Sequence, residues 1–395
     1  MKHFTVLTII LLFSITLFSF ETDGMIRNYS GIFIENRETA VFENTFKVNL
    51  YDHSPLHSAI AEIFLHQSPG IYEFNMRQLY GSVNSGSFTL TGGKFLDQWA
   101  YSRELRITDI VGPIDLSDFL IPGFDEIREG VTMFMISAGN NEHKADIIYV
   151  PQFESNTAPA EDSPWTPAQA NDKTIIMRQA EGIENNFNDY EVFARYRYTM
   201  SSLETGFIGG FNFNDSPYQA REMFPDSLLI TPVFERHISI GANTRYKMPG
   251  KSLFAEVLYQ HNIMTESSLP DSIFLEHASS IDYVLGLNHS VMGFNYTLQF
   301  HQSIIPFYRD TYISEQFYNF GIIQMSKKAG KFKFVIKSLI EMNENINTLL
   351  HPQIFFIPSK NTIMKAGSYI FTGSTGKYGQ FNKNDFAYIK LIYNF

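Results

Sequence analysis

The chain has 395 residues, of which 44% are hydrophobic, 15% aromatic and 18% charged, and it carries a formal net charge of −11 and no cysteine. The negative charge argues against nucleic acid as a partner. The lack of cysteine excludes disulfides, thiolate metal sites and a lipidated cysteine anchor.

The N-terminal segment, residues 1–19, has a basic Lys2 followed by an apolar stretch from Phe4 to about Phe18. This pattern predicts a secretory signal peptide, which leaves 20–395 as the mature domain. An uncleaved anchor helix is the alternative, because no A-x-A cleavage pattern is present. Beyond residue 20, no apolar run approaches the ~18 residues that a membrane-spanning helix needs.

The rest of the chain alternates between apolar and polar residues. From 190 to 200 every even position is apolar or aromatic. The odd positions are polar and include Arg195 and Arg197, with Phe193 as the one exception. A period of two is typical of a strand. Similar runs lie at 42–51, 58–67, 71–83, 87–96, 131–138, 145–150, 188–201, 204–214, 233–248, 251–263, 279–289, 292–303, 315–326, 330–342, 346–357, 361–372 and 384–395.

So many alternating runs predict an all-β fold, a transmembrane antiparallel β-barrel, because only helices and closed barrels satisfy every backbone group in lipid. Bacterial single-chain barrels have even strand numbers, so we expect about 16 strands, within a range of about 14–18. Short polar connections alternate with long ones, as in barrels with short turns at one end. The long connections are 97–130, 151–187, 214–232 and 264–278. A soluble periplasmic all-β protein is the alternative, but the apolar faces end in Tyr and Phe, as aromatic girdles do.

The segment 97–130 is too long and too mixed in character for a plain surface loop. Its apolar residues need cover, while Asp109, Asp115, Asp118 and Arg128 need water or charged partners. A loop folded into a polar lumen satisfies both needs, and opposed charges across a pore make a selective constriction. An external loop packed on its own side chains is the alternative.

Basic residues lie at the inward positions of two predicted strands. Arg195 and Arg197 share one face of the first strand, and Lys331, Lys333 and Lys337 share one face of the second. If these basic residues face the acids on the loop across the lumen, the channel favours anionic or polar solutes. Alternatively, these charges pair across the lumen and only hold the barrel in shape. We find no catalytic motif, no metal-ligand spacing and no sign of a cofactor.

The chain closes on "LIYNF", in which Leu391, Tyr393 and Phe395 occupy alternate positions. This ending resembles the C-terminal signature of Gram-negative outer-membrane proteins. The resemblance implies insertion into the bacterial outer membrane, with the barrel-assembly machinery and outer-membrane lipid as partners.

A second resemblance covers 93–165. It is similar to an uncharacterised porin-like barrel family of Gram-negative bacteria, in which a strand runs into a Trp-containing loop with Asp, Pro and Asp-Leu. The matching residues, in order, are Trp99, Asp109, Pro113, Asp115, Leu116, Arg128, Pro151, Phe153, Pro159 and Trp165. Ala100 and Gly130 depart from the family pattern of Gly and Pro. The resemblance implies the fold and a lumen-inserted loop, and it names no substrate.

Together these features predict a porin-like outer-membrane channel for passive diffusion of small polar or anionic solutes, and no enzyme. One alternative is a conduit for a hydrophobic or polymeric ligand. Another is a non-conducting structural or adhesive surface barrel. The sequence leaves a homotrimer open, since porins often form trimers but no feature here establishes one.

Overall fold

The computed structural model describes residues 20–119, 126–161, 163–166, 174–184, 186–269 and 272–395. The predicted signal peptide, 1–19, lies outside the described residues, as do 120–125 of the predicted loop. Within the described ranges, helix is confined to η1 (Phe187–Asp189) and α2 (Gly376–Gly379). None of the helices in this part of the chain is long and apolar enough to span a membrane.

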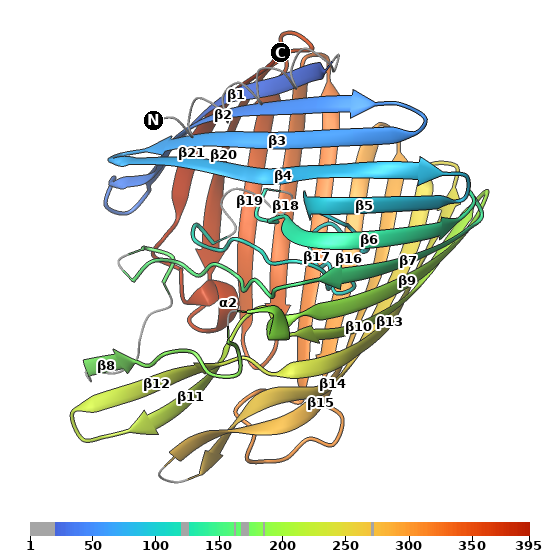
Figure 1. Cartoon of the computed structure of the whole chain (residues 1–395). Helices are drawn as coiled ribbons and strands as arrows, with labels where there is room; N and C mark the ends of the chain where they lie inside the picture. The colour runs from blue at the N-terminus through green and yellow to red at the C-terminus, as the bar shows by residue number, and fades with distance from the viewer. Residues whose placement is uncertain (1–19, 120–125, 162, 167–173, 185, 270–271) are drawn as a thin grey trace, which may run out of the picture.

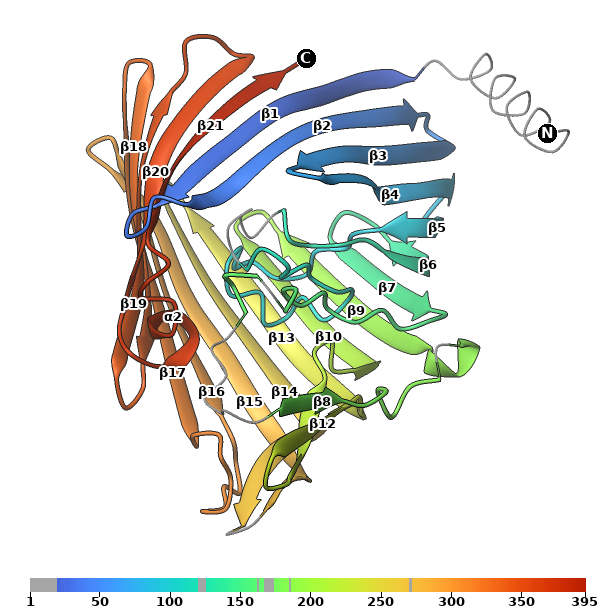
Figure 2. The same cartoon turned by 90° about the vertical axis from the view of Figure 1, so that its left-hand side faces the viewer.

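Eighteen antiparallel strands of the described chain close into a barrel (Figure 1). Each strand pairs with the next in chain order, except that β7 pairs with β9 and β10 with β13. The first and last strands close the ring, from Met25 opposite Asn394 to Phe33 opposite Phe386 (Figure 2). The barrel strands are β1 (Glu21–Phe33), β2 (Thr39–His53), β3 (His57–Ser68), β4 (Ile71–Ser85), β5 (Phe88–Phe95), β6 (Val131–Gly139), β7 (His143–Val150), β9 (Glu191–Met200), β10 (Leu203–Phe213), β13 (Arg236–Met248), β14 (Lys251–Leu269), β15 (Ser272–Val291), β16 (Phe294–Ile304), β17 (Phe317–Ala329), β18 (Phe332–Met342), β19 (Ile346–Phe356), β20 (Thr362–Thr372) and β21 (Phe386–Asn394).

The strand number corrects the expected value of about 16, although 18 is the upper limit of the expected range. Each of the predicted runs overlaps a barrel strand, and the strand that the sequence did not reveal is β1. Its outward positions include the polar Asn28 and Ser30, whereas its inward Tyr29 and Phe33 are buried. Because its polar and apolar positions are exchanged there, β1 shows little of the expected alternation.

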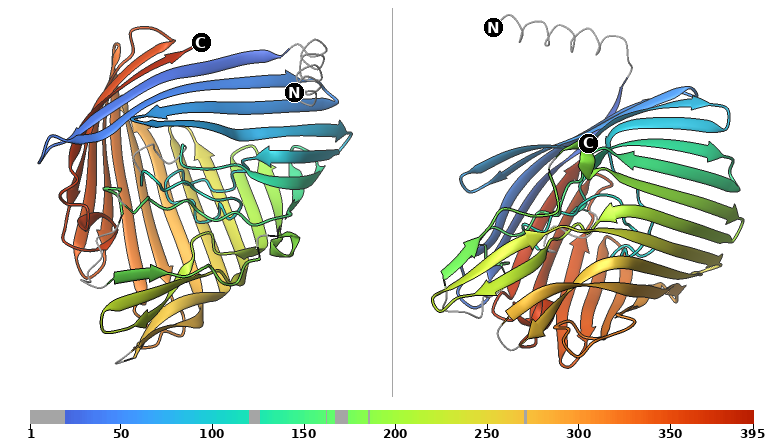
Figure 3. Two further views of the ribbon diagram at one scale, coloured as in Figure 1. Left: turned by 60° about the vertical axis from the view of Figure 1, so that its left-hand side comes forward. Right: turned by 60° about the horizontal axis from the view of Figure 1, so that its bottom comes forward.

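Three further strands lie outside the ring. They are β8 (Thr174–Met177), β11 (Tyr218–Met223) and β12 (Ser227–Val233). β11 and β12 form a hairpin, β8 runs parallel to β12, and β11 meets β15 at one residue pair, Arg221 and Ile273. These strands extend the sheet beyond one end of the barrel (Figure 3).

The two faces of the barrel wall differ in chemistry. On β21 the outward Ile389, Leu391 and Tyr393 are 62%, 44% and 48% exposed, while the inward Tyr388 and Lys390 are buried. The same separation holds on β9 and β18, so an apolar surface faces outward and the charged side chains face inward. The alternation in the sequence therefore places polar side chains inside the barrel.

The two ends of the barrel also differ. At the end where β1 begins and β21 finishes, here the terminus end, every connection is short; these are 54–56, 86–87, 140–142, 201–202, 249–250, 292–293, 330–331 and 357–361. The opposite end, here the loop end, has the long connections; these include 96–130, 151–190, 214–235, 305–316 and 373–385. This division is typical of outer-membrane barrels, whose short turns gather at one end.

Candidate pore-lining site

The chain between β5 and β6 is held against the inward face of β14 by one carboxylate. Glu256, 2% exposed, accepts hydrogen bonds from the backbone N–H groups of Tyr101 and Ser102, at 2.8 and 2.6 Å. Its other oxygen accepts one from the Thr108 hydroxyl at 2.6 Å. A carboxylate that accepts several hydrogen bonds is a strong anchor, because each bond is charge-assisted.

Two further wall residues, Asn243 and Gln299, hold the same segment, and Asp109 holds it in its folded shape. Asp109 folds it on itself by accepting hydrogen bonds from the backbone N–H groups of Trp99 and Ala100, at 2.5 and 3.0 Å. The side chain of Asn243, on β13, donates to the Trp99 carbonyl at 2.7 Å. On β16, Gln299 accepts a hydrogen bond from the Ser102 hydroxyl at 2.7 Å. The segment 97–109 therefore contacts inward-facing side chains of several strands.

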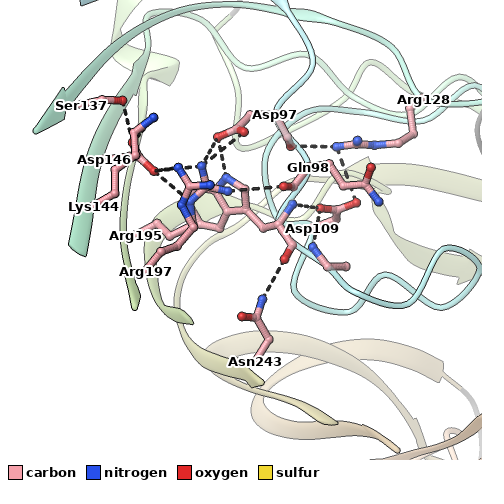
Figure 4. Close-up of polar contacts among 12 residues, drawn as sticks. Asp97, Gln98, Asp109, Arg128, Ser137, Lys144, Asp146, Arg195, Arg197 and Asn243 are labelled. Carbon is pink, nitrogen blue, oxygen red and sulfur yellow. Dashed lines mark hydrogen bonds and ion pairs between the residues drawn. The ribbon is translucent and has the colours of Figure 1, made fainter. Parts of the chain in front are cut away.

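The predicted arginines of β9 belong to an ion-pair cluster at this segment (Figure 4). Arg195 lies 2.9 Å from the Asp146 carboxylate and 3.1 Å from that of Asp97. Arg197 shares Asp146 at 3.2 Å, and Lys144 lies 3.8 Å from it. Arg195 also lies 4.9 Å from the ring centre of Trp99, within reach of a cation–π interaction. The structure thus brings Arg195 and Arg197 together inside the barrel, with acids beside them.

The three predicted lysines are placed differently from one another. Lys337 faces inward on β18 and lies 2.9 Å from the Glu104 carboxylate. Lys333 faces inward near the terminus end, 5.5 Å from the ring centre of Phe355. Lys331 is exposed in the turn before β18, so the structure corrects its expected place on the strand.

The predicted charges of the segment itself fall into two groups. Arg128 donates to the Asp97 carbonyl at 2.9 Å and lies 3.6 Å from the Asp109 carboxylate, so these residues meet at the Arg195 cluster. Asp115 and Asp118 lie apart from this cluster, on the side that faces β2, β3 and β4.

Two polar cavities separate the segment from the wall near the terminus end. Their volumes are about 420 and about 480 Å³, and both are lined by Tyr101, Arg103 and Arg245. The first also meets Arg197, and the second meets Lys337. The Arg245 guanidinium lies 4.5 Å from the ring centre of Tyr101 and pairs with Glu204. Basic groups therefore outnumber acids on these walls.

A third cavity, of about 130 Å³, lies toward the loop end. Its acidic lining residues are Glu43, Glu73, Asp115, Asp118, Glu126 and Glu129. Arg27 and Arg77 also line it, and Arg27 pairs with Glu43 and Glu126. Burial raises the pKa of Glu129, although a hydrogen bond from Asn75 opposes this shift.

An aromatic cluster covers the inward wall on the side of β1 and β17–β21. Trp165, from the connection after β7, is 3% exposed and lies 5.9 Å from the rings of Phe371 and Phe386, centre to centre. Ile127 packs in the same cluster, and Phe119 stacks on Trp165 at 6.1 Å. The connections after β5 and β7 thus meet in one cluster on this side of the barrel interior.

Several residues of the site were not singled out from the sequence. They are Glu256, Asn243, Glu104, Arg103 and Arg245. Glu256 was recognisable as a polar position in the run 251–263, as were Asn243 and Arg245 in 233–248. Alternation gives the face on which these residues lie, but the hydrogen-bond partners of Glu256 and Asn243 in the loop lie more than a hundred residues away in the chain.

No protein-family model and no curated protein matches the chain. Solved structures do resemble it. OccK11 (OpdR) of Pseudomonas aeruginosa superposes with a TM-score of 0.53 at 7% identity, covering 94% of this chain and 95% of that one. OprD of P. aeruginosa superposes with a TM-score of 0.53 at 9% identity, covering 95% of this chain and 94% of that one. OccAB3 of Acinetobacter baumannii superposes with a TM-score of 0.51 at 8% identity, covering 95% of this chain and 99% of that one.

The fold is a porin-like β-barrel, shared with these solved structures. At these identities the likeness extends to the architecture alone. The charged residues that line this porin-like barrel must therefore be interpreted from their own geometry.

Proposed function

We propose that the protein is a porin-like channel of the bacterial outer membrane, which passes small polar or anionic solutes by passive diffusion. In this proposal the segment 97–130 is a lumen-inserted constriction loop. Its support is the set of bonds from Glu256, Asn243 and Gln299 to residues 99–108. The fold shared with outer-membrane barrels supports the location.

The observation that carries the proposal is the lining of the two cavities beside the loop. Arg103, Arg197, Arg245 and Lys337 line them, with the acids Glu104 and Glu204. An excess of positive charge in a narrow, partly desolvated passage attracts anions and repels cations. Because several of these basic groups also form ion pairs, they hold the wall in shape while they set its potential.

The experiment is conductance in planar bilayers with the refolded mature chain. We expect stable single-channel steps and, across a gradient of about 1 M against about 0.1 M KCl, a reversal potential of the sign for anion preference. Arg245→Gln combined with Lys337→Gln should shift that potential toward cation preference. Lys327→Gln is the matched control, since Lys327 points outward on β17 over the Phe294 ring, at 4.2 Å. Conduction with cation preference in the parent chain would contradict the proposal.

The route to the membrane belongs to the same proposal. Residues 1–19 act as a signal peptide, and Leu391, Tyr393 and Phe395 form the signal that the barrel-assembly machinery reads. All three side chains are exposed on the outward face. Fractionation of cells that express the full chain should recover a shortened, heat-modifiable protein in outer membranes. Cross-linking of the same fraction would report whether it is a homotrimer.

A second candidate, a filled and non-conducting surface barrel, is favoured by one observation. The aromatic cluster around Trp165 and Ile127 covers much of the wall at β1 and β17–β21. If that packing closes the interior, bilayers will show insertion without current steps. The same conductance experiment therefore separates the two candidates.

A further inference from the structure

The inward face of the barrel carries opposite fixed charges at its two ends. Near the terminus end, basic side chains lie within four residues of the strand ends; they include Lys144, Arg197, Arg245, Lys333, Lys365 and Lys390. The inward acids at the same level are Glu21 and Asp23 on β1, Asp146 and Glu204, fewer than the basic side chains, and the last two are already paired with arginine or lysine. The net fixed charge at this end is positive.

Lys365 and Lys390 show that this charge is built into the sheet. They are directly opposite each other on β20 and β21, an arrangement of like charges that destabilises a sheet. Within the described residues, neither amine has an acidic side chain in ion-pair range. Instead, Lys390 lies 3.8 Å from the ring centre of Tyr29, and Lys365 lies 5.3 Å from that of Tyr388. Aromatic rings are thus the cation–π partners of both amines.

The loop end has the opposite sign. Six acidic side chains line the cavity between the constriction loop and strands β2, β3 and β4, where only two arginines and His66 oppose them. Arg27 is bound to two of the acids, and Arg77 lies 3.9 Å from the Glu62 carboxylate. Asp115, Asp118 and Glu129 form no ion pair among the residues that the structure describes, so negative charge remains there.

We propose that the lumen is a bipolar junction that conducts ions asymmetrically, an inference that rests on the proposed channel function. Anions are the mobile ions in the positive zone, and cations are the mobile ions in the negative zone. When the loop end is at the higher potential, both species move toward the junction between the zones and accumulate there. With the opposite sign both leave the junction, and its conductance falls.

The test is the ratio of currents at equal and opposite voltages, with channels of known orientation. Because the chain has no cysteine, Ser201→Cys places a single thiol in an exposed turn of the terminus end, where a membrane-impermeant reagent reports the side. In about 0.1 M KCl we expect roughly twofold or more current with the loop end positive. In about 1 M KCl the ratio should approach unity, as the Debye length shrinks from ~10 to ~3 Å.

Variants at the two ends test the charges separately. Lys365→Gln with Lys390→Gln removes unpaired positive charge, and Asp118→Asn with Glu129→Gln removes negative charge from the other end. Each pair should reduce the current ratio, whereas Lys327→Gln on the outward face should leave it unchanged. Heat-modifiable migration confirms that each variant is folded.

The outcomes separate this inference from the channel proposal. Open channels with equal currents in dilute salt, or with the larger current at the opposite polarity, would overturn the bipolar lumen and leave the channel standing. A barrel that never conducts would overturn both.

Discussion

Replacing Glu256 by Ala should release the proposed constriction loop, 97–130, without unfolding the barrel. The Glu256 carboxylate is the only acceptor shown for the Tyr101 and Ser102 N–H groups and the Thr108 hydroxyl in the described structure. A buried donor left without an acceptor costs about 1–3 kcal/mol. With partial relief by lumen water, the loop should detach more easily by roughly 3–6 kcal/mol. Glu256→Gln keeps one carbonyl oxygen for the Tyr101 and Ser102 N–H groups but replaces the oxygen that accepts from Thr108 by an NH2 donor. It therefore loses charge assistance and one acceptor, and its cost should be nearer ~2 kcal/mol.

Trypsin provides the assay, because Arg103 and Arg106 lie in the anchored segment. The parent barrel should resist cleavage there, Glu256→Gln should be cut slowly and Glu256→Ala quickly, while heat-modifiable migration is retained. Open-channel conductance and current noise should rise in the same order. Glu266→Gln is the matched control, since Glu266 is on the same strand and binds Arg221 rather than the loop. Unchanged protection in Glu256→Ala would refute the anchoring role.

Three further predictions concern assembly, stability and pH. Phe395→Ala should lower the yield of heat-modifiable barrel in outer membranes, measured against total chain by immunoblot; an unchanged yield contradicts its role as an assembly signal. Arg195→Ala removes the ion pair of Asp97 and one of the three cations beside the buried Asp146, which keeps Arg197 and Lys144. It should lower the free energy of unfolding by about 1.5–3 kcal/mol in urea titrations, as the loss of a hydrogen bond between charged groups does. Arg178→Gln, which removes an exposed ion pair, should cost under ~1 kcal/mol. Burial raises the pKa of Glu129 above the usual value of about 4.3. As the pH falls, its carboxyl therefore takes up a proton earlier than an exposed glutamate does, which removes the cost of burying its negative charge. Anion preference should therefore increase on mild acidification, and Glu129→Gln should weaken that response.

The barrel could be predicted because its physical cause is local. A strand between lipid and water must alternate its side chains, and every run that the sequence showed became a barrel strand. The sequence did not predict β1, because Asn28 and Ser30 point outward. There Asn28 donates a hydrogen bond to Asn44 of β2 at 2.8 Å. Polar side chains that satisfy each other on the outward face erase the pattern on which the prediction depended.

The candidate site was predictable only in part. Alternation gave the inward face of Arg195, Arg197, Lys333 and Lys337, and all four do face inward. Strand ends are less certain than faces, which is why Lys331 fell in a turn. The pairing of Lys337 with Glu104 joins residues far apart in the chain. Such contacts follow from how the loop folds, and no local pattern specifies that.

In a membrane-spanning barrel, hydrocarbon meets the outward face of the wall and water meets the inward face. Neighbouring residues of β18 test it directly: Ile336 is outward and 41% exposed, and Lys337 is inward. In the cysteine-free chain, reconstituted in lipid, Lys337→Cys should react with a small water-soluble thiol reagent, and Ile336→Cys should not. A fluorophore at Ile336→Cys should instead be quenched by brominated lipid. Equal aqueous reactivity at both positions would contradict a wall with a lipid-facing outer side and a water-facing inner side.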